Sequence, residues 1–119
     1  MVRKRLNSFR YAFAGLSTLV SSQPNARIHL AATILVIAFA ILLNIALWEW
    51  AILALAAGMV WTAEALNTAL EFLADRVAPE KHELVRKAKD TAAGGVLAAA
   101  VAAAAAGLLI FVPHFLLLV

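Results

Sequence analysis

Three long apolar stretches constrain the fold of this 119-residue chain more than any other feature. Their most apolar parts cover residues 30–43, 51–60 and 91–111. A helix crosses the hydrocarbon core of a bilayer in about 20 largely apolar residues. Each stretch, taken with its flanks, therefore predicts one transmembrane helix. The predicted spans cover residues 25–47, 50–75 and 82–118.

The composition excludes a soluble or a disordered chain. The sequence is 65% hydrophobic and 14% charged, whereas soluble domains are about half apolar and a quarter charged. Disorder needs low hydrophobicity and high net charge, and the net charge here is only +3. We therefore expect one membrane-embedded all-α domain over residues 1–119. A bundle this small has little core of its own, so we expect it to form oligomers.

An amphipathic helix is predicted before the first span, over residues 6–22. Its large apolar residues recur at spacings of three and four, which places them on one stripe of a helix: Leu6, Phe9, Phe13, Leu16 and Val20. Basic residues precede this stripe, a combination typical of helices that lie in the membrane interface. The proline at position 24 then ends or redirects the helix.

The distribution of lysine and arginine predicts the orientation in the membrane. These residues lie before the first span and around the turn between the second and third spans: Arg3, Lys4, Arg5, Arg10, Arg27, Arg76, Lys81, Arg86, Lys87 and Lys89. Because positively charged loops stay in the cytoplasm, we expect a cytoplasmic N-terminus and an external C-terminus. Asn44 and residues 48–50 are expected to close the first span, and His114 to lie at the external interface.

An acidic stripe on the second span is the strongest candidate for chemistry. At about 100° per residue, Glu64, Asn67, Glu71 and Asp75 occupy one narrow face. A charge in the middle of a bilayer costs at least about 2.5–3.5 kcal/mol, so these groups must face protein, a bound cation or water. One interpretation is a polar network that fixes helix packing. The other is a cation or proton site that opens on the cytoplasm.

Lys89 and Asp90 sharpen the second interpretation, because they begin the third span at about the membrane level of Glu71 and Asp75. A lysine beside acids can neutralise them or can hold a phosphate. Carboxylates with Mg²⁺ and a lysine are the minimum needed to bind the phosphates of a nucleotide. The sequence has no glycine-rich phosphate loop, so nucleotide binding would not be of the Walker type.

The sequence resembles the prokaryotic diacylglycerol kinase family in several blocks that follow one another in order. Residues 64–71 read Glu-Ala-Leu-Asn-Thr-Ala-Leu-Glu, and three further blocks follow them: Asp75-Arg76, His82-Glu83-Leu84 and Ala88-Lys89-Asp90. Residues 8–15 and 25–29 also fit the family pattern. The resemblance covers nearly the whole chain.

The resemblance implies a homotrimer of three-span subunits in the bacterial inner membrane, each with an N-terminal surface helix. Its active sites are shared between neighbouring subunits at the cytoplasmic face. The implied reaction moves the γ-phosphate of Mg-ATP to the hydroxyl of diacylglycerol and yields phosphatidic acid, with no nucleic acid partner. Residues 25–29 look more like members linked to undecaprenol, which is therefore the alternative substrate.

Individual residues match positions with known roles in that family. Glu64 matches the general base, Glu71 a metal-binding glutamate, and Asn67 a positioning residue. The matched nucleotide contacts are Tyr11, Gln23, Glu71, Glu80, Lys81, His82, Lys89 and Asp90. The region around Asn25, Arg27 and His29 lies where the family begins its first span, near lipid and nucleotide. Many members carry a second metal-binding glutamate where this chain has Gln23. An amide oxygen can coordinate Mg²⁺ but brings no charge.

Two functions of other classes compete with a lipid kinase. A bundle lined by the acidic stripe would serve as a cation or proton pathway and predicts ion flux that does not depend on nucleotide. A purely structural membrane subunit would need neither activity. Both require the combination of Glu64, Glu71, Lys89 and Asp90 to be a coincidence.

Overall fold

The computed structural model describes all residues from 1 to 119 and is entirely helical. Its elements are α1 (Val2–Ser22), α2 (Pro24–Leu42), α3 (Leu47–Val77) and α4 (Glu83–Leu118). The last three are long and apolar enough to cross a membrane. The predicted all-α fold, with a helix preceding three candidate spans, is confirmed, and the chain is a multi-pass membrane protein.

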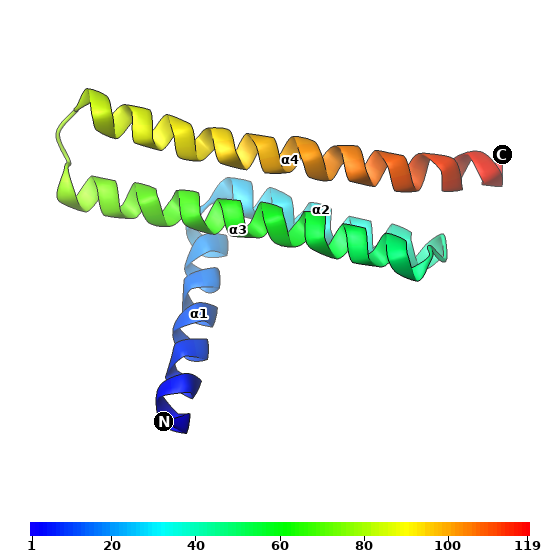
Figure 1. Ribbon diagram of the computed structural model, residues 1–119, viewed down its shortest axis with the longest axis horizontal. Coiled ribbons are helices and arrows are strands. Elements are labelled where there is room, and N and C mark those ends of the chain that lie inside the picture. Colours follow the sequence, from blue (N-terminus) through cyan, green and yellow to red (C-terminus); the bar gives the residue numbers. More distant parts are fainter.

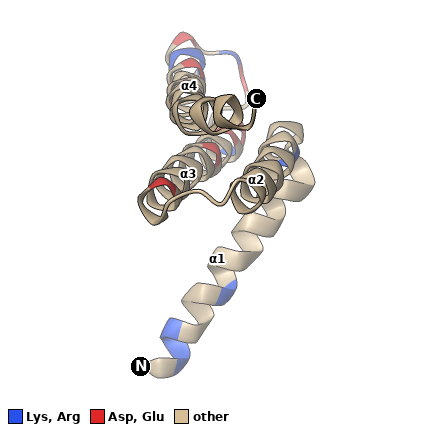
Figure 2. Ribbon diagram, turned by 90° about the vertical axis from the view of Figure 1, so that its right-hand side faces the viewer, with Lys and Arg blue, Asp and Glu red and all other residues tan.

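The helices form a loose three-sided bundle with one projecting arm. α3 and α4 lie antiparallel and pack along much of their length, whereas α2 packs against α3 over a shorter stretch. Viewed along the bundle, α2, α3 and α4 stand at the corners of a triangle (Figure 2). α3 and α4 extend beyond the start of α2 toward their shared connection at residues 78–82 (Figure 1).

α1 leaves this bundle at a steep angle (Figure 1). Its apolar stripe is uncovered, since Phe9 and Phe13 are more than 60% exposed and only Leu19 is buried. This arrangement fits an amphipathic helix that lies along a membrane surface. α1 begins at Val2, four residues before the predicted start at residue 6. Arginine and lysine are good helix formers, so the basic segment continues the helix instead of preceding it.

The predicted end of the first span was wrong. α2 ends at Leu42 and α3 begins at Leu47, so residues 48–50 form the first turn of α3 and do not close the previous helix. Asn44 adopts a φ of 50°, a left-handed conformation that asparagine tolerates better than most residues. The Ala46 N–H then donates to Glu49 Oε1 at 2.9 Å, which satisfies an amide at the start of α3.

At the end of the bundle opposite the α3–α4 connection, Glu49 makes a second contact, which joins α3 to α4. His114 Nε2 lies 3.0 Å from Oε1 and 3.2 Å from Oε2 of this carboxylate. Glu49 is 6% exposed. The pair therefore joins the first turn of α3 to the end of α4, beside a small apolar cluster of Ala40, Ile45, Leu53 and Ile110. His114 is thus a partner of Glu49 in addition to its expected place near the interface.

Only 11 of the 119 residues are buried within the chain, and most large apolar side chains are exposed. A soluble protein of this size buries well over half of its accessible surface. Acyl chains or neighbouring proteins must therefore cover the apolar surface of α2, α3 and α4.

We predict that Glu49→Ala lowers the melting temperature by several degrees, because it leaves both the Ala46 amide and His114 without their acceptor. The measurement is thermal unfolding in detergent micelles, followed by the emission of the nearby tryptophans. Glu83→Ala is the matched control, since Glu83 is an exposed carboxylate that is bonded only to Arg86. Equal melting temperatures for the two variants would contradict a stabilising role of the Glu49 contacts with Ala46 and His114.

Candidate active site

α3 carries the acidic stripe without a break, because the helix is continuous from residue 47 to residue 77. The exposure of its polar side chains falls steadily along the helix. Asp75 is exposed, Glu71 and Asn67 are half-buried, and Glu64 is only 3% exposed. The stripe therefore runs from solvent into the bundle and ends on a buried carboxylate.

Glu64 meets one basic side chain at the inner end of this stripe. His29 Nε2 on α2 lies 3.0 Å from Glu64 Oε1. The ring is not aligned for a hydrogen bond, so Oε1 is buried without a hydrogen-bond partner, as are Asn67 Oδ1 and Thr68 Oγ1. Buried polar groups in native proteins are nearly always bonded. Three unpaired oxygens on neighbouring turns of one helix indicate that a ligand or another chain completes this site.

The start of α2 is held in place by contacts to both of its neighbours. Arg27 donates from Nε to the Val20 carbonyl at 3.1 Å and from Nη2 to the Ser21 carbonyl at 3.0 Å, which fixes the corner between α1 and α2. Trp61 Nε1 on α3 donates to Thr33 Oγ1 at 3.1 Å. These contacts set the register in which His29 faces Glu64.

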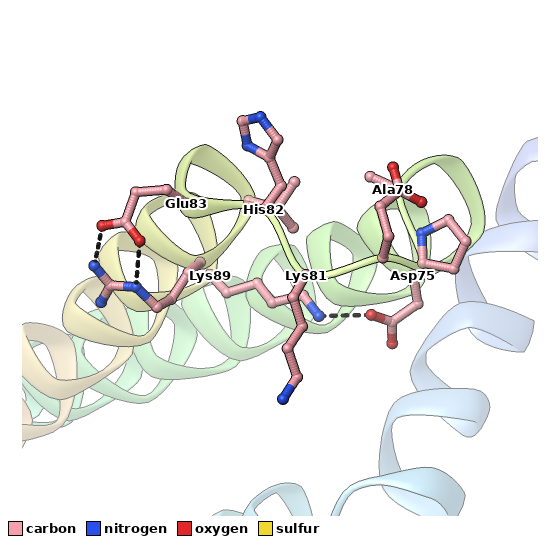
Figure 3. A pocket seen from close by; sticks show the side chains of 10 residues that line it. Asp75, Ala78, Lys81, His82, Glu83 and Lys89 are labelled. Atoms are coloured by element: carbon pink, nitrogen blue, oxygen red, sulfur yellow. Dashed lines mark hydrogen bonds and ion pairs between the residues drawn. The ribbon is translucent and has the colours of Figure 1, made fainter.

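A charged cavity of about 540 Å³ lies at the α3–α4 connection. Four predicted nucleotide-binding residues line it, namely Glu80, Lys81, His82 and Lys89. Lys89 Nζ donates to Asp75 Oδ1 at 2.6 Å and so joins α4 to α3 across the cavity (Figure 3). Lys81 and His82 point to opposite sides of the connection (Figure 3).

Two residues of this region have structural contacts that the sequence did not predict. His82 Nδ1 accepts the Leu84 N–H at 3.1 Å and thereby caps α4. Arg86 lines the cavity and binds Glu83 and, at 3.0 Å, Asp90 Oδ2. The spacing of three and four residues around Arg86 is the sequence signal that was available for these pairs.

The remaining predicted site residues do not line the cavity. Tyr11 is 71% exposed on α1, Gln23 forms the extended corner between α1 and α2, and Asn25 follows in the first turn of α2. No group of three or more histidine, aspartate or glutamate side chains gathers as a metal site within the chain. One chain therefore brings together the residues of the connection but not the whole predicted set.

An apolar groove of about 670 Å³ runs between α2, α3 and α4, and sequence reasoning missed it. Fifteen of its 18 lining residues are hydrophobic, and His29 and Trp61 are among the lining residues. The wall from α4 consists largely of small residues, namely Ala100, Ala103, Ala104 and Gly107. Such a run is equally compatible with close helix packing, so the sequence alone did not distinguish the two.

Groove, buried carboxylate and charged cavity follow one another along α3, in the order Val60, Glu64 and Asp75. These features define an integral membrane protein in which an apolar groove and a charged cavity lie on either side of a buried acid. Residues 10–111 match the family described as Prokaryotic diacylglycerol kinase. The chain belongs to this family, and this confirms the resemblance found in the sequence.

Two relatives agree with this assignment. A protein of Synechocystis sp. named diacylglycerol kinase is 45% identical over 115 residues, which cover 96% of this chain but only 66% of that protein. A protein of Bacillus subtilis named undecaprenol kinase is 37% identical over 106 residues, which cover 89% of this chain and 86% of that protein. The chain thus spans just under two thirds of the first relative and most of the second, and lipid kinase is the enzyme class that both names share.

We predict that Thr33→Val lowers the free energy of unfolding by about 1–3 kcal/mol, because the Trp61 N–H loses its acceptor inside the bundle. Denaturation in mixed micelles measures this free energy. Thr91→Val is the matched control, since that exposed hydroxyl bonds only to the Lys87 carbonyl of its own helix. Equal free energies of unfolding for the two variants would contradict a stabilising contact between Thr33 and Trp61.

Proposed function

We propose that this protein is an ATP-dependent kinase that transfers the γ-phosphate of Mg-ATP to the hydroxyl of diacylglycerol and forms phosphatidic acid. The observation that carries the proposal is the position of Glu64, a buried carboxylate between an apolar groove and a charged cavity. A lipid alcohol has its hydroxyl at the boundary of the same two environments.

Glu64 acts as the general base in this proposal. Its Oε1 has no hydrogen-bond partner in the chain and is therefore available to accept a proton. As the hydroxyl proton moves to Glu64, the alcohol oxygen forms a bond to the γ-phosphorus. The bond between that phosphorus and the bridging oxygen breaks, and ADP leaves. Asn67, one turn further along α3, positions the reacting groups.

The charged cavity holds the nucleotide. Its volume falls in the range of small-molecule sites, and Lys81 and Lys89 supply positive charge for the phosphates. Lys89 is bonded to Asp75, so phosphate binding exchanges one anionic partner for another. The family resemblance adds Tyr11, Gln23, Glu80, His82 and Asp90 as further nucleotide contacts.

Glu71 and Gln23 are the proposed magnesium ligands. Both offer oxygen donors, which Mg²⁺ prefers, and this ion usually binds through one or two carboxylates together with the phosphates of its substrate. A site with few protein ligands is therefore sufficient. When bound, the ion neutralises charge on the transferring phosphoryl group. Gln23 contributes an uncharged amide, so Glu71 supplies the proposed charged ligand.

We propose a homotrimer in the bacterial inner membrane, with a cytoplasmic N-terminus and active sites shared between subunits. One observation supports association, since few residues are buried within one chain. The positive-inside rule supports the orientation, since basic residues lie in and around the α3–α4 connection, whereas the α2–α3 connection has none.

Undecaprenol is the second candidate substrate, because the Bacillus subtilis relative carries the name undecaprenol kinase. The test offers diacylglycerol and undecaprenol at equal mole fraction in mixed micelles with radiolabelled ATP. We expect label in phosphatidic acid. Label in undecaprenyl phosphate alone would transfer the proposal to the polyprenol, and label in neither would refute the lipid kinase.

Glu64→Gln is expected to lower kcat by about 10²–10⁴-fold, the usual contribution of a general base. The amide keeps the size of the side chain but accepts no proton. Initial rates in mixed micelles measure the effect, and size-exclusion chromatography confirms that the variant keeps its assembly. Wild-type rates in an intact assembly would remove Glu64 as the base.

Lys89→Met is expected to raise the KM for ATP by about tenfold, a loss near 1.4 kcal/mol that is typical of one charge-assisted contact. Lys87→Met is the matched control, because Lys87 lies on the same helix but does not line the cavity. Equal KM values for the two variants would contradict a phosphate contact of Lys89.

A further inference from the structure

We propose that His29 is a positioning residue for the carboxylate of Glu64, an inference that rests on Glu64 being the base of the proposed reaction. The sequence places His29 in the region near lipid and nucleotide but assigns it no role in the reaction. The geometry nevertheless brings its Nε2 to 3.0 Å from Glu64 Oε1, across the contact between α2 and α3.

His29 is the only basic side chain within 4.0 Å of Glu64. Three other cations around the site are bonded to other groups. Arg27 is bonded to carbonyls of α1, Lys89 to Asp75, and Arg86 to Glu83 and Asp90. A carboxylate that is 3% exposed therefore depends on one imidazole for its polar contact from α2.

The contact with His29 restrains the Glu64 carboxylate but leaves most of its hydrogen-bond acceptor sites free. The imidazole lies close to Oε1 but off the direction of a hydrogen bond, and the χ2 torsion that would align the ring is soft. A carboxylate has about four lone-pair sites, so one N–H from His29 leaves room for the hydroxyl of a lipid. The imidazole thus fixes where the acceptor oxygen lies while the oxygen still takes the proton.

His29 also lies where the apolar part of a substrate would end. It is one of the few polar residues that line the groove between α2, α3 and α4. A lipid alcohol lying in this groove therefore passes His29 just as its hydroxyl reaches Glu64. Placement at this point matters, because an error of 1 Å in a reacting group can cost about 10²-fold in rate.

The bundle contains a second histidine–glutamate pair that serves as an internal control. His114 and Glu49 join α4 to α3 at the same Nε2–Oε1 distance of 3.0 Å, and the two histidine side chains are similarly exposed, at 24% and 26%. This pair lies at the opposite end of the bundle from the α3–α4 connection. Loss of either histidine removes a polar contact between helices, but only His29 touches the proposed base.

The test compares His29→Leu, His29→Gln and His114→Leu in mixed micelles, with MgATP and lipid varied separately and the melting temperature measured for each protein. We expect His29→Leu to lower kcat by about 10–100-fold, in line with a misplaced base, and to leave the KM for MgATP within about twofold. His29→Gln should recover most of the lost kcat, because its amide offers an N–H at nearly the reach of Nε2. His114→Leu should lower the melting temperature and keep the wild-type kcat.

Three results would overturn the proposal. Wild-type kcat in His29→Leu would exclude any role of the imidazole in the reaction. A loss in His29→Gln as large as that in His29→Leu would mean that an N–H donor is not what the base needs. An equal loss of kcat in His114→Leu would reduce His29 to a contact between helices. Failure of the underlying function has a different signature, since Glu64→Gln would then remain active.

Discussion

The burial of one ionisable group, the carboxylate of Glu64, is the constraint around which the rest of this bundle is organised. A charge removed from water is costly unless other groups replace the lost hydration. Within the chain the replacement is incomplete. One imidazole approaches the carboxylate, and the neighbouring oxygens on α3 are unpaired. Stability alone would be served better by an apolar residue or an amide at this position.

The lengths of the helices explain how a buried acid remains connected to water. α2 has 19 residues, whereas α3 has 31 and α4 has 36. The two longer helices continue past the start of α2 (Figure 1), and the residues of the acidic stripe follow one another along this part of α3. Glu64 therefore lies level with the early turns of α2, while Asp75 is exposed near the connection and bonded to Lys89. The exposure of the acidic side chains therefore rises along α3 because of the helix lengths and the regular spacing of these residues. No special loop is needed.

The sequence predicted the parts of this arrangement that depend on spacing along one helix. Hydropathy gave the three spans, and a step of about 100° per residue gave the common face of Glu64, Asn67, Glu71 and Asp75. The sequence could not predict features that depend on contacts between helices. The approach of His29 to Glu64 requires the register between α2 and α3, to which the Trp61–Thr33 bond contributes.

Local conformation accounts for the errors in helix boundaries. The corner after Leu42 depends on the left-handed backbone of Asn44 and on the carboxylate of Glu49 that caps the next helix. The polar residues Asn44 and Glu49 indicated a boundary in this region, but hydropathy did not show that one helix ends before Asn44 and that the next includes Glu49. The apolar groove was missed for a related reason. A run of alanines specifies small volume on α4, but only the position of α2 decides whether that volume is filled by a helix or left as a groove.

The same physical reasoning explains why the single chain brings together only part of the predicted site. A connection of five residues joins α3 to α4 and keeps the start of α4 close to the end of α3. The cavity there is therefore lined by Glu80, Lys81 and His82 of the connection and by Lys89 of α4. Tyr11 and Gln23 lie on α1 and its corner, and α1 projects away from the bundle (Figure 1). A helix that projects in this way can contribute to the site of a neighbouring subunit as readily as to its own.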